Sequence, residues 1–97
     1  MTDVTKPRVI RELSETLSTP LGVFRTRVLG AEREDGTWDA RLEFVPASDA
    51  GTRYWTGVET HQRERRQVEG WASGLTPVYA EGAFARAVAA SRTSCQC

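Results

Sequence analysis

The residues with the greatest capacity for chemistry lie together in the segment THQRERRQVEGW, Thr60–Trp71. It contains the only histidine of the chain, His61, and three arginines, Arg63, Arg65 and Arg66. Guanidinium groups bind phosphate through paired hydrogen bonds, so such a cluster could form a site for a phosphorylated ligand or for RNA. The same residues on the solvated side of a helix would only keep that helix soluble.

The spacing of the acidic residues favours the solvated helix. Because residues three or four positions apart are neighbours on a helix surface, a helix with Thr60 as its N-cap brings acidic and basic side chains together. The expected ion pairs are Glu59 with Arg63, and Glu69 with Arg65 or Arg66. The segment is therefore interpreted as a self-paired helical face, with phosphate binding as the alternative.

No catalytic constellation accompanies His61. The sequence contains no nucleophile elbow and no glycine-rich phosphate loop of the G-x-x-x-x-G-K-S/T or G-x-G-x-x-G type. Cys95 and Cys97 form a C-x-C pair at the C-terminal end, which is two ligands short of a structural zinc site. We therefore expect no catalytic residue, no metal and no organic cofactor; a redox or metal-delivery role of the tail and a small enzyme of unknown class are the alternatives.

The amino-acid composition limits the classes of partner that the chain is expected to bind. Thirteen basic and thirteen acidic residues among 97 give a net charge of zero, which counts against a dedicated binder of nucleic acid or of membrane surfaces. No segment approaches the ~20 apolar residues of a membrane span, and the N-terminus has no apolar targeting region. A cytoplasmic location is the resulting expectation.

The elements that must position these residues begin with a predicted helix over Pro7–Leu17, where proline opens an approximately helical apolar spacing. Two alternating segments, Gly22–Gly30 and Trp38–Pro46, flank Asp35-Gly36 and predict an antiparallel hairpin. A third strand is predicted over Arg53–Thr60.

Two helices complete the chain. One begins at Thr60 and ends near Gly74, and the other begins with the cap-then-proline pair Thr76-Pro77. The fold class is therefore α+β: a three-stranded antiparallel meander packed against helices, in the order α-β-β-β-α-α. Residues 7–92 form a single domain between a disordered N-terminus, 1–6, and a flexible tail, 93–97.

Periodicity predicts which residues are buried. The residues assigned to the core share the inward positions of these strands and helices, and they are Phe24, Val28, Trp38, Leu42, Phe44, Val58, Val68, Trp71, Leu75, Phe84 and Val88. The opposite face of the sheet is mixed and carries Arg25, Arg41, Arg53 and Trp55. A slip of one residue in the strand register would exchange the roles of Tyr54 and Trp55. Trp55 is either an interface residue or is covered by the sheet edge or the first helix.

Two resemblances bear on function. The order helix–strand–strand–strand–helix is similar to that of the double-stranded-RNA-binding domain, which implies phosphate contacts from Arg63, Arg65 and Arg66. The hairpin turn is acidic where that family presents polar groups to the minor groove.

The segments GTWDARLEFVP and WASGLTPVYAEGAFARA resemble a small uncharacterised bacterial family, over about 21–87. The resemblance implies a bacterial domain and carries no activity or binding residue.

The function that these observations favour is contact with other proteins. A chain of this size buries a limited share of its apolar surface, so association is a common supplement. We expect a non-catalytic protein–protein interaction or regulatory module that binds another protein or itself, as a homo-oligomer and most simply a dimer. The expected contact residues are Trp55, Arg53, Arg41, Arg63, Arg66 and Tyr79.

Overall fold

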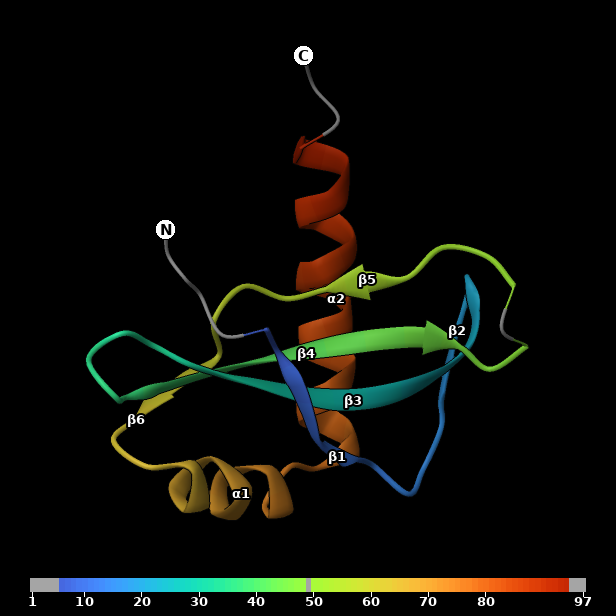
Figure 1. Ribbon diagram of the computed structural model, residues 1–97. Helices are drawn as coiled ribbons and strands as arrows, with labels where there is room; N and C mark the ends of the chain where they lie inside the picture. Colours follow the sequence, from blue (N-terminus) through green and yellow to red (C-terminus); the bar gives the residue numbers. More distant parts are fainter. Residues whose placement is uncertain (1–5, 49, 95–97) are drawn as a thin grey trace.

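The computed structural model describes residues 6–48 and 50–94, and these form an α+β fold (Figure 1). In the described part, six antiparallel strands are followed by two helices. They are β1 (Arg8–Glu12), β2 (Leu17–Thr19), β3 (Gly22–Glu32), β4 (Trp38–Pro46), β5 (Tyr54–Trp55), β6 (Thr60–Gln62), α1 (Arg65–Ser73) and α2 (Pro77–Ser94). The α+β class is confirmed, but the predicted order α-β-β-β-α-α is wrong, since the strands come first.

The predicted hairpin is confirmed as the pair β3 and β4, which forms the centre of the sheet (Figure 1). Its register runs from Phe24 opposite Pro46 to Glu32 opposite Trp38. In the turn, Asp35 accepts hydrogen bonds from the backbone N–H and the hydroxyl of Thr37. Gly36 has a φ of 87°, a conformation that glycine adopts without steric cost.

The helix predicted over Pro7–Leu17 is wrong, because this segment forms β1 and β2. Both strands pair with β3, and together they make one edge of the sheet, interrupted between Leu13 and Thr16. The apolar spacing suited a helix, but β-branched Val9 and Ile10 also suit a strand. The open backbone edge of β3 decided the outcome, since its N–H and C=O groups need partners.

The opposite edge is also interrupted. The single strand predicted over Arg53–Thr60 is divided into β5 and β6, which both pair with β4. Between them, the hydroxyl of Thr56 accepts a hydrogen bond from the backbone N–H of Leu42 at 3.0 Å. Thr60 therefore lies in strand β6. The prediction that Thr60 is a helix N-cap is wrong.

Helix α1 begins five residues after the predicted cap. Its N-cap is Glu64, and the side-chain oxygen of Gln67 accepts hydrogen bonds from the backbone N–H groups of Arg63 and Glu64, each at 3.0 Å. The start of α2 is confirmed at Pro77: the hydroxyl of Thr76 accepts from the backbone N–H of Tyr79 at 3.1 Å. Both helices lie on the same face of the sheet, and α2 crosses it behind β3 and β4 in Figure 1.

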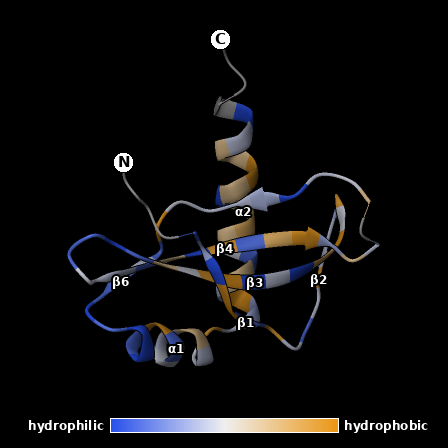
Figure 2. Cartoon of the chain, in the orientation of Figure 1, coloured by the Kyte–Doolittle hydropathy of each residue, from blue (hydrophilic) through white to orange (hydrophobic). Residues whose placement is uncertain are grey.

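The core lies between that face and the helices. In Figure 2 the hydrophobic colours gather where the sheet crosses α2, whereas the hairpin loop and the start of α1 are hydrophilic. Most predicted core residues are confirmed as buried, and Trp38, Trp71 and Leu75 pack against the cluster while partly buried. Val58 is a wrong assignment: it lies in the irregular segment between β5 and β6 and is 49% exposed.

Tyr54 and Trp55 take opposite faces. Tyr54 points into the core, where its ring lies 5.6 Å from that of Phe84 in an edge-to-face arrangement. Trp55 points to the other face of the sheet and is 48% exposed.

Neither helix α1 nor helix α2 is apolar and long enough to cross a membrane, in the residues described.

Candidate functional site: the open face of the sheet

The second face of the sheet carries no helix among the described residues, and we name it the open face. It presents Arg25 and Arg27 from β3 and Asp39, Arg41 and Glu43 from β4, because alternate residues of a strand point to the same side. The edge strands add the residues that lie opposite these positions, namely Val9, Glu12, Trp55 and His61.

Glu43 is the centre of this face. Its side chain is 7% exposed, with Arg27 at 3.5 Å and Arg53 at 3.1 Å. Trp55 lies directly opposite Glu43 in the register of β4 and β5. Arg27 is also 3.9 Å from Glu12, so carboxylates and guanidinium groups alternate across the sheet from one edge to the other.

A second cluster lies nearer the hairpin loop. Asp39 is 2.7 Å from the guanidinium of Arg33 and 2.7 Å from Nδ1 of His61, which lies opposite it in β6. Partial burial raises the pKa of Asp39, but the hydrogen bonds from His61 and Arg33 lower it by more, so the pKa lies below its ordinary value. The same contact raises the pKa of Arg33.

Arg41 lies between the two clusters. It is exposed, and in residues 6–48 and 50–94 no carboxylate lies within ion-pair distance of its guanidinium. With Leu29, Ala31 and Asp39 it lines an open hollow of about 600 Å³ that continues along the hairpin loop, where Arg33 and the acidic Glu32, Glu34 and Asp35 also line it. A guanidinium without an internal partner, beside an open hollow, is available to a ligand.

The structure therefore brings together three of the six predicted contact residues. Arg53 bonds Glu43, Trp55 lies opposite Glu43, and Arg41 lies on the same side of β4. Arg66 belongs to α1 and Tyr79 to α2, and Arg63 lies in the segment between β6 and α1. The open face also includes Glu12, Arg27, Asp39 and Glu43, which the sequence did not single out, and His61, which was expected near the start of a helix.

Two of the three arginines of the segment Thr60–Trp71 pair with glutamates, as expected for a solvated helical face. Arg65 pairs with Glu69 at 3.0 Å, as predicted, and its guanidinium lies 5.9 Å from the centre of the Trp38 ring. Arg66 pairs with Glu64 at 2.7 Å. The pair of Glu59 with Arg63 is wrong, because Glu59 bonds residues of α2.

Tyr79 forms a separate polar corner with Glu59. Its hydroxyl donates to Glu59, and Arg86 donates to the same carboxylate oxygen at 2.6 Å. Burial raises the pKa of Tyr79, and the hydrogen bond to Glu59 raises it further. The ring of Trp71 lies edge-on to Tyr79 at 6.1 Å. This corner fastens the first turns of α2 to the edge of the sheet.

These contacts do not form a metal site among the described residues. Within the described ranges, no three histidine, cysteine, aspartate or glutamate side chains are grouped closely enough to hold an ion. Cys95 and Cys97 lie outside the described residues, as do residues 1–5 of the predicted disordered N-terminus.

Comparisons with protein-family models, with curated proteins and with solved structures found no match to this chain.

Proposed function

We propose that this chain is a non-catalytic protein-contact module, and that its open face binds a carboxylate-rich segment of another protein. The observation that carries the proposal is the position of Trp55: it lies half exposed beside Arg53 and Glu43, on a sheet face that no helix covers in the described residues. Tryptophan and arginine are the residues that dominate binding energy at protein interfaces.

The charge of the open face supports an acidic partner. At and beside its strands, four arginines, Arg25, Arg27, Arg41 and Arg53, accompany three carboxylates, Glu12, Asp39 and Glu43, whereas Arg33 lies in the hairpin loop, beside the acidic Glu32, Glu34 and Asp35. All three carboxylates have basic neighbours, and in the described residues no carboxylate lies within ion-pair distance of Arg41, so the charge of Arg41 remains for a partner. Complementary charge speeds encounter and selects among partners.

Apolar area lies beside that charge. Val9 and Val23 are each 44% exposed on the open face, and the hollow beside Arg41 continues the surface toward the hairpin loop. Interfaces combine apolar anchors with a polar rim in this way. An acidic segment with an apolar anchor would cover Trp55 while its carboxylates reach Arg41 and Arg53.

A peptide-display selection against the intact protein tests the proposal. We expect the selected peptides to be rich in aspartate and glutamate and to quench the fluorescence of Trp55. Trp55→Ala should weaken their binding roughly thirtyfold, as removal of an interface hot spot of about 2 kcal/mol does. Arg41→Ala should weaken it several-fold and reduce its dependence on salt.

Arg63→Ala is the matched control, because it removes an exposed arginine that lies outside the strands, between β6 and α1. It should leave peptide binding unchanged. The proposal is overturned if no acidic peptide is selected, or if Arg63→Ala weakens binding while Trp55→Ala does not. Unfolding curves of all three variants check that each remains folded.

Self-association of the chain stays a prediction. Size-exclusion chromatography with light scattering measures the mass of the protein in solution. Both edges of the sheet are interrupted, between Leu13 and Thr16 and again between β5 and β6, which shortens the backbone available for edge-to-edge pairing. A mass of twice 10.8 kDa would identify a homodimer. If Trp55→Ala then restored the monomer, the partner at the open face would be a second copy of the chain.

A further inference from the structure

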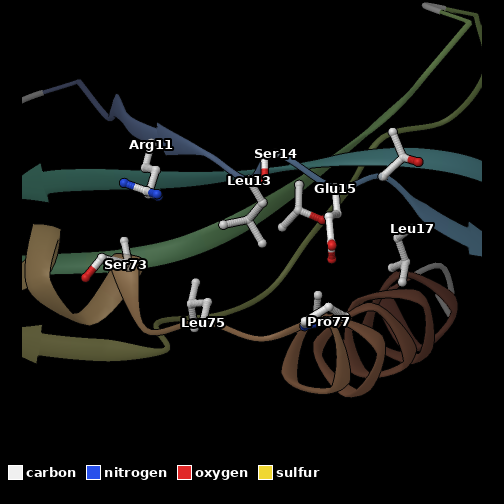
Figure 3. Close-up of a pocket in the computed structure, with 12 residues that line it drawn as sticks. Arg11, Leu13, Ser14, Glu15, Leu17, Ser73, Leu75 and Pro77 are labelled. Carbon is white, nitrogen blue, oxygen red and sulfur yellow. The ribbon is translucent and has the colours of Figure 1, made fainter.

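The interruption between β1 and β2 opens a cavity on the helical side of the sheet. The backbone N–H of Leu13 still donates to the carbonyl of Thr26 at 2.9 Å, but the chain then leaves β3 until Leu17. The space below, about 230 Å³, is bounded by the loop, by the end of α1 and by the start of α2 (Figure 3). Sites for drug-sized ligands have about 300–1,000 Å³, so this cavity suits a smaller molecule.

Thr26 gives the wall of this cavity an unpartnered polar group. Its side chain is 1% exposed, and its hydroxyl has no hydrogen-bond partner among the described residues. A buried polar group without a partner is destabilising, and natural structures satisfy the great majority of them. Since Thr26 lines the cavity, a bound molecule with a donor or acceptor group would satisfy it.

The rim supplies one charge of each sign. Arg11 lies on one side of Leu13, near Ser73, and Glu15 extends on the other side, toward Pro77 (Figure 3). Neither Arg11 nor Glu15 has an oppositely charged partner in the described part of the chain. Leu13, Leu17 and Leu75 also line the cavity and offer apolar contacts to a bound molecule.

We infer that the cavity binds a small zwitterion: an amino acid whose uncharged side chain ends in an amide or a hydroxyl group. Its carboxylate pairs with Arg11, its ammonium group pairs with Glu15, its methylene groups contact the leucines, and its polar end bonds the hydroxyl of Thr26. Each of these groups of the cavity therefore contacts one part of the ligand, and no covalent step is involved. The site lies across the sheet from the open face.

Titration of the full chain with L-glutamine, followed by calorimetry and by amide chemical shifts, tests the inference. We expect saturable binding with a dissociation constant at or below about 1 mM, and shifts around Leu13, Thr26 and Leu75. L-methionine, with a side chain of similar length but no amide, should bind about tenfold more weakly, the cost of one hydrogen bond. Glutaramate, which lacks the amine, and γ-aminobutyramide, which lacks the carboxylate, should each bind more weakly than L-glutamine.

Variants locate the site. Thr26→Val keeps the shape of the side chain and should weaken L-glutamine about tenfold while leaving L-methionine unchanged. Glu15→Gln and Arg11→Gln should weaken L-glutamine several-fold, and Trp55→Ala, on the open face, should have no effect. The inference is overturned if no amino acid binds and the cavity holds only water, or if L-glutamine and L-methionine bind equally to the wild type and to Thr26→Val.

Discussion

At the scale of single residues, two carboxylates of low exposure, Glu43 and Glu59, each contact two partners. Glu43 lies between Arg27 and Arg53, and Glu59 accepts from both Tyr79 and Arg86. A paired charge of low exposure adds little net stability, but removing one partner leaves the other poorly compensated. These two carboxylates are therefore the residues whose substitution reports most directly on the structure.

Replacement of Glu43 by glutamine should lower the free energy of unfolding by about 1–3 kcal/mol, because Arg27 and Arg53 lose their charged partner. Arg53 is half exposed, so water compensates part of its loss. Urea unfolding measures the change. Glu34→Gln, at an exposed position of the hairpin loop, is the matched control and should change stability little. Equal effects of the two variants would contradict the central role of Glu43.

Tyr79 gives the protein a pH dependence in the alkaline range. Its pKa is raised, so the folded state holds the phenol proton more tightly than the unfolded chain does. Stability from this residue is therefore complete below the unfolded pKa of about 10 and is lost as the pH rises through the higher folded value. Tyr79→Phe should flatten the fall of unfolding free energy between about pH 9 and 11, and an unchanged slope would refute this assignment.

At the scale of elements, the molecule consists of one long hairpin whose two edges are each completed by a broken strand. The breaks have different consequences. Between β5 and β6, Thr56 satisfies the N–H of Leu42 with its hydroxyl. Between β1 and β2, the departure of the chain opens the cavity beside Thr26. Gly30 allows the close approach of β1 to β3, since a Cβ there would lie 2.8 Å from Cγ1 of Ile10.

Gly30→Ala should therefore lower the free energy of unfolding by about 1–3 kcal/mol, the usual cost of overpacking. The cost should shrink when Ile10→Ala removes the opposing carbon, and a double-mutant cycle measures this coupling. Gly57→Ala is the control, because no atom lies within 4 Å of the Cβ it would add. Strictly additive effects of the Gly30 and Ile10 substitutions would show that the contact does not limit the approach of the strands.

At the scale of the whole molecule, the two faces of the sheet have separate roles. One is covered by α1 and α2 and contains the core, and the other is open and carries Arg25, Arg27 and Arg41 on its central strands. The helix-first order that made the chain similar to a double-stranded-RNA-binding domain is not the order found. Two of the three arginines assigned to that role pair with glutamates of the same helical region.

We expect duplex RNA to bind weakly or not at all. Charge-driven binding requires unpaired cations, whereas Arg65 and Arg66 are paired and the hairpin loop carries Glu34 and Asp35. A gel-shift titration at low salt checks this. Submicromolar binding that is lost in Arg63→Ala would contradict it and would return the RNA-binding alternative to first place.

Local sequence accounts for the parts of the fold whose determinants are close together. The alternation in β3 and β4, the Asp35-Gly36 turn and the Thr76-Pro77 start of α2 are each specified within a few residues, and all three predictions are confirmed. The same holds for the ion pair of Arg65 with Glu69, four residues apart on one helix. Only half of the predicted contact residues are brought together, because their grouping depends on the register of strands far apart in the chain.

The sequence by itself determined the α+β class, the central hairpin, the start of the last helix and most of the core, since periodicity and turn chemistry act over short distances. Only the tertiary structure decided that Arg8–Glu12 is a strand, that Thr60 belongs to β6 and that Asp39 meets His61. The physical reason is the open backbone on both sides of the hairpin. Its unpaired N–H and C=O groups recruit neighbouring segments into the sheet, whatever helical spacing those segments carry.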